Sequence, residues 1–127
     1  MNTASWTKQQ RKKKRVAILE DSHTYAHLLS ASMLVMQLDP HVVYSLAEFK
    51  GLQGDWNYAT LDLEVTDSTA EQTAEWVLGN LNPANCLIVS GSADTLAVTN
   101  LIKAGFDFVD KRDAPKVLDR MGRWFKV

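Results

Sequence analysis

The chain contains five short segments rich in consecutive apolar residues, and each is followed by a stretch with apolar residues at helical spacing. The five segments cover residues 16–19, 41–45, 58–65, 86–89 and 106–111. Continuous apolar runs of this length are typical of strands buried on both faces, whereas a half-exposed strand alternates apolar and polar residues. The pattern therefore predicts five strands in a parallel sheet that is covered on both sides.

Apolar residues spaced three or four apart predict a helix after each strand. The first helix begins near Ser22 or Thr24, either of which can cap it, and Asp39-Pro40 stops it. The other helices are expected over residues 46–52, 70–81, 93–104 and from 114 onward. Strands that alternate with helices in this way predict a doubly wound α/β domain.

Polar residues with reactive side chains stand at the ends of four of the expected strands. Glu20 and Asp21 follow the first strand, Asp62 lies near the end of the third, Ser90 follows the fourth and Lys111 ends the fifth. An ionised carboxylate at the end of a buried strand costs free energy unless the site uses it. Ligands of doubly wound sheets bind outside the carboxyl ends of the strands, so we expect these five residues to converge there.

Three carboxylates in one place predict a divalent cation, and Mg²⁺ prefers carboxylate oxygens and also binds phosphate. Asp62 is then a candidate nucleophile that accepts a phosphoryl group, with Lys111 and the metal neutralising its charge. The Ser90 hydroxyl can bond a phosphoryl oxygen, and Gly91 beside it leaves room for the group. A simpler interpretation of Glu20 and Asp21 is a helix start, because acidic residues favour the first helical turn.

Length and composition indicate one domain inside a reducing compartment. The chain has 127 residues, 46% of them hydrophobic, which is enough for one core and too short for two ordinary domains. The single cysteine, Cys86, excludes a disulfide framework. No apolar stretch approaches the roughly 20 residues needed to cross a bilayer. We therefore expect a cytoplasmic protein that does not insert into membranes.

The net charge of −1 conceals an asymmetry between the N-terminal segment and the rest of the chain. Six of the 14 basic residues lie between Lys8 and Arg15, whereas the remainder of the chain is acidic. We predict a basic, flexible arm over residues 1–14 and a folded domain over 15–127. The arm is interpreted as a solvated lead-in to the first strand, although a basic segment can also attract nucleic acid or an anionic surface. Without a recognition helix or zinc motif, DNA binding by this chain alone is not expected.

Four segments together resemble the receiver domain of bacterial-type response regulators, across residues 15–127. They are Val16-Ala17-Ile18-Leu19-Glu20-Asp21-Ser22, Thr60-Leu61-Asp62-Leu63, Ile88-Val89-Ser90-Gly91 and Ala104-Gly105-Phe106-Asp107-Phe108-Val109-Asp110-Lys111. The resemblance implies a flavodoxin-like (βα)5 fold with strand order 2-1-3-4-5. It also implies a signalling protein of two-component systems rather than an enzyme that turns over a substrate.

The resemblance assigns a role to each candidate residue. Metal binding falls to Glu20, Asp21, Asp62 and the backbone carbonyl of Glu64, with Mg²⁺ as the cofactor. Asp62 would accept the phosphoryl group from a sensor histidine kinase or a histidine phosphotransfer protein, and Ser90 and Lys111 would bind that group. Phe108 matches the aromatic residue that swings inward when the hydroxyl residue, here Ser90, moves.

The expected readout of this chemistry is a change in a binding surface. The resemblance implies a downstream protein partner or an output domain outside this sequence, and receivers of this family can also form homodimers. The partner-binding face in the family most often comprises the fourth and fifth helices and the strand between them. Phosphorylation of Asp62 would bias this surface between two states.

Two loops depart from the pattern of the family. After the phosphoacceptor the family has a proline and a glycine-containing turn, whereas this chain reads Glu64-Val65-Thr66-Asp67-Ser68. After its lysine the family has a proline joined by a cis bond, whereas Arg112 follows Lys111 here. A cis bond to a residue other than proline costs about 2.5–4 kcal/mol, so we predict a trans bond and an altered loop.

Two other functions fit parts of the sequence. The segment from Asp62 to Thr66 also resembles the nucleophile motif of haloacid-dehalogenase-type Mg-dependent phosphatases, but that family has a second Asp where Glu64 stands. That family also places its acidic pair after the lysine rather than before the nucleophile. The altered loops are alternatively compatible with a receiver-like module that signals without phosphorylation.

Overall fold

Five parallel strands form one sheet in the computed structural model, which describes residues 13–91 and 95–125. The strands are β1 (Arg15–Leu19), β2 (Asp39–Val43), β3 (Tyr58–Leu61), β4 (Cys86–Ser90) and β5 (Asp107–Asp110). Their order across the sheet is β2-β1-β3-β4-β5, and all four pairings are parallel. The predicted doubly wound fold and its strand order are both confirmed.

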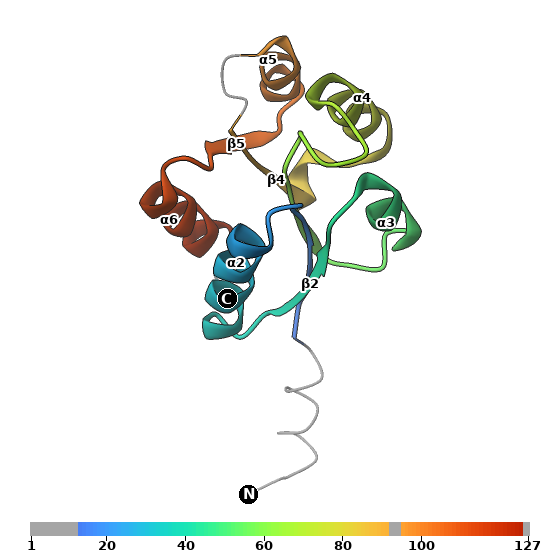
Figure 1. Cartoon of the computed structure of the whole chain (residues 1–127). Coiled ribbons are helices and arrows are strands. Elements are labelled where there is room, and N and C mark those ends of the chain that lie inside the picture. The colour runs from blue at the N-terminus through green and yellow to red at the C-terminus, as the bar shows by residue number, and fades with distance from the viewer. Residues whose placement is uncertain (1–12, 92–94, 126–127) are drawn as a thin grey trace, which may run out of the picture.

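Helices cover both faces of the sheet (Figure 1). They are α2 (His23–Val35), α3 (Leu46–Gly51), α4 (Ala70–Asn80), α5 (Leu96–Lys103) and α6 (Ala114–Trp124), with a 3-10 turn at Pro83–Asn85. One hydrophobic core lies between the sheet and α3, α4 and α5, and the other lies between the sheet and α2 and α6. No helix in the described ranges is long and apolar enough to cross a membrane.

Successive residues of each central strand point into opposite cores. Ala17 and Leu19 of β1 belong to the core under α3, α4 and α5, whereas Val16 and Ile18 belong to the core under α2 and α6. Side chains alternate between the two faces of a strand, so a strand with a core on each side needs apolar residues at every position. This is the physical reason for the continuous apolar runs in the sequence.

The strand register brings the carboxyl ends of the central strands to one edge. Leu19 pairs with Leu61, and Leu61 pairs with Ile88. Beyond the strand ends, the backbone N–H of Asp62 donates to the carbonyl of Leu19 at 2.9 Å, and that of Lys111 donates to Ser90 at 3.1 Å. The backbone positions of the predicted site residues are therefore neighbours at this edge of the sheet.

The boundaries of α2, β2 and β3 differ from those expected, and β3 ends at Leu61 rather than at residue 65. Ser22 caps α2, which excludes the alternative cap Thr24, but the helix ends at Val35 rather than at Asp39-Pro40. Gln37 follows with a φ of 63°, a left-handed conformation that ends a helix. The expected strand 41–45 was placed too late, because β2 already includes Asp39 and Pro40. Proline is tolerated because β2 is an edge strand that pairs with β1 alone.

Part of the sequence prediction lies outside the described residues. The described ranges do not include residues 1–12, which make up most of the predicted basic arm. They also do not include residues 92–94, at the start of the helix expected over 93–104. Within the described ranges that helix is α5, which begins at Leu96 with Thr95 as its N-cap.

Thr60 in the middle of β3 supplies a test of the packing. It is 1% exposed, and its hydroxyl has no hydrogen-bond partner among the described residues. A buried hydroxyl without a partner costs free energy, so Thr60→Val should raise the free energy of unfolding by about 1 kcal/mol. Urea denaturation measures this change.

Thr73 is the matched control for that substitution. It is also fully buried, but its hydroxyl bonds to the Ser68 hydroxyl at 2.8 Å and to the Thr69 carbonyl at 2.9 Å. Thr73→Val should therefore lower the free energy of unfolding by about 1 kcal/mol. Equal destabilisation by both substitutions would contradict the assignment of Thr60 as the residue without a partner.

Candidate functional site

The five residues predicted at the strand ends lie together at the carboxyl edge of the sheet. Glu20 follows β1, Asp62 follows β3, Ser90 is the last residue of β4 and Lys111 follows β5. Glu20, Asp62 and Ser90 are buried, and the Lys111 side chain is 22% exposed. Asp21, beside Glu20, is half-buried. The sheet thus places carboxylates, a hydroxyl and an ammonium in one partly dry site.

Both carboxylate oxygens of Asp62 are held by donors from other strands. The Ser90 hydroxyl donates to Asp62 Oδ1 at 3.0 Å, and the Lys111 ammonium donates to Asp62 Oδ2 at 2.9 Å. The backbone N–H of Glu64 also approaches Oδ1, at 3.4 Å. Each carboxylate oxygen of Asp62 thus has at least one hydrogen-bond donor, which offsets the cost of burying it.

Lys111 joins two buried carboxylates. Its ammonium lies 3.0 and 2.9 Å from the two carboxylate oxygens of Glu20, in addition to its contact with Asp62. Burial alone would lower the pKa of Lys111, but the hydrogen bonds to Asp62 and Glu20 raise it above the ordinary value. The side chain is therefore a permanent cation at neutral pH.

Tyr25 of α2 supports this lysine. Its ring lies under the Lys111 ammonium, 4.9 Å from the ring centroid, and its hydroxyl donates to the Lys111 backbone carbonyl at 2.9 Å. Burial raises the pKa of the Tyr25 hydroxyl, so it stays a donor. Tyr25 was not among the predicted site residues, because its contact joins residues 86 positions apart and has no local sequence signature.

Glu20 is the most enclosed acid of the site. Burial raises its pKa, while the hydrogen bonds from Lys111 and from the backbone N–H of Ser22 act in the opposite direction. The Ser22 N–H lies 3.0 Å from Glu20 Oε2, so the start of α2 also helps to hold this carboxylate. Glu20 and Asp21 both precede the N-cap Ser22, and the first turn of α2 contains no acidic residue, so the simpler interpretation of the pair as acids of the first helical turn is wrong.

Glu20, Asp21 and Asp62 each place a carboxylate oxygen within 4.8 Å of the other two. One ammonium faces these three acids, so two formal negative charges remain for a divalent cation to balance. Two of the three acids, Asp21 and Asp62, border a cavity of about 400 Å³, whose lining also includes Glu64, Val65, Gly91, Lys111 and Arg112. Oxygen donors beside an open cavity fit Mg²⁺, which keeps several of its waters.

The loop after Asp62 forms a turn without proline or glycine. Val65 and Ser68 exchange backbone hydrogen bonds of 3.1 and 3.2 Å. Asp67 accepts the backbone N–H groups of Leu46 at 2.8 Å and Ala47 at 3.0 Å, which ties the loop to the first turn of α3. These bonds lower the pKa of the Asp67 carboxyl. Side-chain bonds thus order a loop that departs from the sequence pattern of the family.

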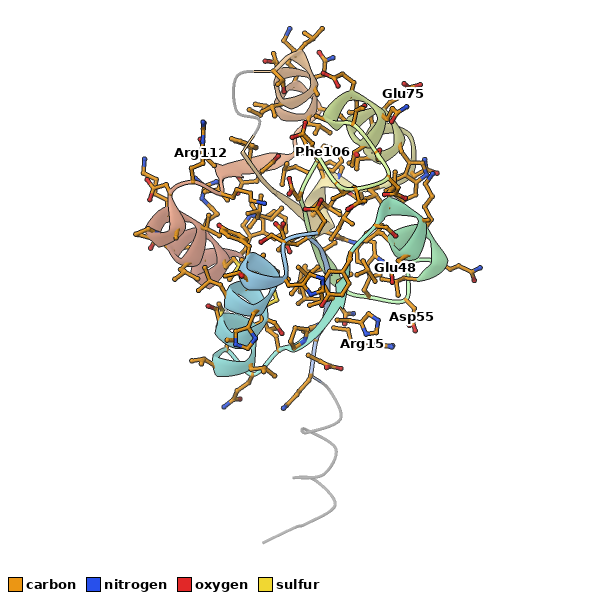
Figure 2. All side chains as sticks on the ribbon, in the orientation of Figure 1. Arg15, Glu48, Asp55, Glu75, Phe106 and Arg112 are labelled. Atoms are coloured by element: carbon orange, nitrogen blue, oxygen red, sulfur yellow. The ribbon has the colours of Figure 1, made fainter. Side chains whose placement is uncertain are left out.

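The second unusual loop contains Arg112. No peptide bond in the described ranges is cis, so the predicted trans bond after Lys111 is confirmed. The Arg112 guanidinium binds Asp110 through Nε and Nη2 at distances of 2.6–3.1 Å, and these bonds lower the pKa of Asp110 to about 2. Figure 2 shows Arg112 projecting from the segment between β5 and α6. The expected switch residue Phe108 is half-buried and packs against the core under α3, α4 and α5.

Sequence comparison identifies no relative of this chain. No family model matches the chain. No curated protein matches it either.

Solved structures give a clear likeness at the level of fold. A CheY-like response regulator receiver domain from Methanospirillum hungatei has a TM-score of 0.73 at 17% identity, covering 90% of this chain and 94% of that one. The non-phosphorylated HemR receiver domain from Leptospira biflexa has a TM-score of 0.74 at 18% identity, with coverages of 91% and 96%. The beryllofluoride-activated NtrC4 receiver domain dimer gives 0.67 at 20%, with coverages of 88% and 96%. The chain therefore has the fold of response-regulator receiver domains.

The bonds of Asp67 predict a pH-dependent contribution to stability. Asp67→Ala removes the acceptor of two backbone N–H groups in the first turn of α3 and should lower the free energy of unfolding by about 1 kcal/mol at pH 7. The folded pKa lies below the ordinary aspartate value of 3.8, so this contribution is present in full well above pH 3.8 and is lost as the pH falls through the folded pKa. Urea denaturation from pH 7 to pH 2.5 measures the difference between the two proteins.

Glu75→Ala is the control for this experiment, because Glu75 is an exposed helical acid that makes no cap. It should change stability by less than about 0.5 kcal/mol at every pH. A loss in Asp67→Ala that stays constant down to the lowest pH would contradict the assigned role of the carboxylate.

The acidic cluster predicts that Mg²⁺ stabilises the fold. A ligand that binds the native state at about ten times its Kd adds roughly 1.4 kcal/mol, which corresponds to several degrees in Tm. Asp21→Asn removes one of the three acids and should reduce the Mg²⁺-induced rise in Tm, whereas Glu75→Gln should leave it unchanged. Equal rises in the wild type and in Asp21→Asn would contradict a metal site at this cluster.

Proposed function

We propose that the chain is a phosphorylatable receiver domain, with Asp62 accepting the phosphoryl group from the phosphohistidine of a sensor histidine kinase or a histidine phosphotransfer protein. The observation that carries the proposal is the coordination of Asp62, whose two carboxylate oxygens meet the Ser90 hydroxyl and the Lys111 ammonium beside Glu20 and Asp21. The fold likeness supports the proposal, and the class of donor follows from the resemblance of the sequence to receiver domains.

The reaction is an in-line phosphoryl transfer. An oxygen of the Asp62 carboxylate forms a bond to phosphorus while the bond between phosphorus and the imidazole nitrogen of the donor breaks, and the electron pair of that bond stays with the imidazole. The product is an acyl phosphate on Asp62. Donors in place before the reaction lower the barrier because they need no reorganisation.

Ser90 and Lys111 change partners in this reaction. Before transfer they hold the carboxylate oxygens of Asp62. After transfer the new negative charge resides on the phosphoryl oxygens, which an ammonium and a hydroxyl at these positions can bind. A Cβ added at Gly91 would contact the Lys111 side chain at 3.9 Å, so a side chain at this position would lie beside the ammonium that binds the phosphoryl oxygens.

Mg²⁺ would be held by Glu20, Asp21, Asp62 and the backbone carbonyl of Glu64, and it would supply charge neutralisation for the transferred group. Lys111 already compensates part of the negative charge of the buried acids. Lys111 is thus the cation of the resting site, and the acidic cluster would hold a divalent ion in addition.

The switch would begin at Ser90. A phosphoryl group draws the hydroxyl away from its resting bond, and Ser90 is directly followed by the segment that leads to α5. Phe108 on β5, which pairs with Ile88 of β4, would respond to this movement. The resulting change of surface would be read by a downstream protein, by an output domain or by a second receiver, as in the NtrC4 dimer.

Phosphorylation is tested by intact mass after incubation with acetyl phosphate and Mg²⁺. The wild type should gain the mass of one phosphoryl group, and Asp62→Asn should gain none. The absence of a gain in the wild type, which would favour a module that signals without phosphorylation, or a gain that persists in Asp62→Asn, would contradict the proposal. Sustained turnover of a generic phosphomonoester that requires Asp62 would instead favour the phosphatase.

Lys111 provides a graded test of the same chemistry. Lys111→Ala removes the ammonium from Asp62 and should slow the phosphorylation by about 100-fold. Lys103→Ala, at an exposed lysine in the last turn of α5, is the matched control and should leave the rate unchanged. Equal rates for all three proteins would show that the Lys111 contact does not assist the transfer.

A further inference from the structure

An amphipathic groove lies between α4 and α5, and none of its lining residues lines the cavity beside Asp62. Its cavity of about 310 Å³ has Ala74, Leu78, Leu96 and Ala97 among its apolar lining and Glu71, Glu75 and Asn100 among its polar lining. Leu78 is 42% and Leu96 is 72% exposed, although both are large apolar residues. Two exposed leucines on facing helices indicate a surface that another apolar group covers.

The charge of the groove has one sign. Glu71 and Glu75 lie one helical turn apart on α4, and neither forms an ion pair with a described residue. Figure 2 shows Glu75 on the outer side of α4. Like charges at this spacing repel each other. The helix dipole stabilises the negative charge of Glu71, which lies in the first turn of α4, but not that of Glu75. The groove therefore fits a segment that combines an apolar side chain with positive charge.

Residues 1–12 of the chain have this combination. They contain Trp6, Lys8, Arg11 and Lys12 and no acidic residue. A cavity of this volume is at the lower limit of ordinary ligand pockets, which begin at about 300 Å³, so it takes one or two side chains rather than a domain. A second folded copy is a poor match, because stable dimers bury about 1,200–2,000 Å².

The segment is also long enough to reach the groove from its point of attachment. It joins β1 through Lys13 and Lys14, and β1 is separated from β4 by β3 alone. Twelve extended residues span up to about 40 Å, while a domain of about 100 residues has a radius of gyration near 13 Å. The helix α4 ends just before the 3-10 turn that leads into β4, so the Leu78 end of the groove lies near the edge of the sheet where the strands begin.

We propose that the groove between α4 and α5 binds the N-terminal segment of the same molecule, with Trp6 between Leu78 and Leu96 and the basic residues facing Glu71 and Glu75. The contact requires neither Mg²⁺ nor phosphorylation. It gives the basic segment a defined position on the acidic domain and makes α5, one wall of the groove, sensitive to whether the segment is bound.

Paramagnetic relaxation enhancement tests this contact in the full chain. A nitroxide is attached to the new cysteine of the variant Thr7→Cys. The native cysteine, Cys86, does not compete for the label, because it is buried and its burial raises the pKa of its thiol to about 12. The amide signals of Ala74, Leu78 and Ala97 should broaden selectively, while those of α2 and α6 should not. Broadening spread over all faces, or confined to another face, would overturn the proposal.

Substitutions in the groove and in the N-terminal segment test whether the broadening comes from a specific contact. Glu71→Gln and Glu75→Gln should each lower the bound population about threefold, in line with exposed ion pairs, and Trp6→Ala should abolish the selective broadening. Asp119→Asn, which removes an exposed carboxylate on α6, is the control and should leave it unchanged. The broadening should not depend on protein concentration. Growth with concentration would show a second copy as the source and would contradict the intramolecular contact.

Discussion

The ammonium of Lys111 lies between the buried carboxylates of Glu20 and Asp62, and the rest of the site depends on this interaction. Two carboxylates removed from water would repel each other and lose their hydration, and one cation within 3.0 Å of both offsets these costs. The acids follow β1 and β3, and the lysine follows β5, so the ion pairs also tie together strands from both sides of β4. The ion pairs that compensate the buried charges therefore also hold the ends of β1, β3 and β5 together.

The same interaction fits the proposed role of Asp62. The burial of its carboxylate is compensated by hydrogen-bond donors rather than by a covalent partner, as the proposed phosphoryl transfer requires. The donors are supplied by strand ends, whose positions the sheet fixes. Variation in the loops, such as the turn held by Asp67 or the guanidinium pair at Arg112, can therefore occur without displacing the reactive groups.

Much of the fold and of the candidate site could be predicted from the sequence, because both follow from short-range patterns. Buried parallel strands need apolar residues at every position, so the five apolar runs predicted the five strands. The polar residues that follow these runs, Glu20, Asp62, Ser90 and Lys111, were then expected at the carboxyl edge of the sheet, where they meet. The boundaries of β2 were predicted less well, since whether Pro40 is tolerated depends on the edge position of the strand. Contacts such as those of Tyr25 with Lys111 and of Asp67 with α3 were missed, because they join distant segments and follow no spacing rule.

Reductive trapping tests the central claim, phosphoryl transfer to Asp62, most directly. After incubation with acetyl phosphate and Mg²⁺, borohydride reduces an aspartyl phosphate to homoserine, and mass spectrometry of the resulting peptides locates the converted residue. The account predicts homoserine at position 62, dependent on the phosphodonor. Conversion at another acid, such as Asp21 or Glu64, or no conversion at all, would contradict it.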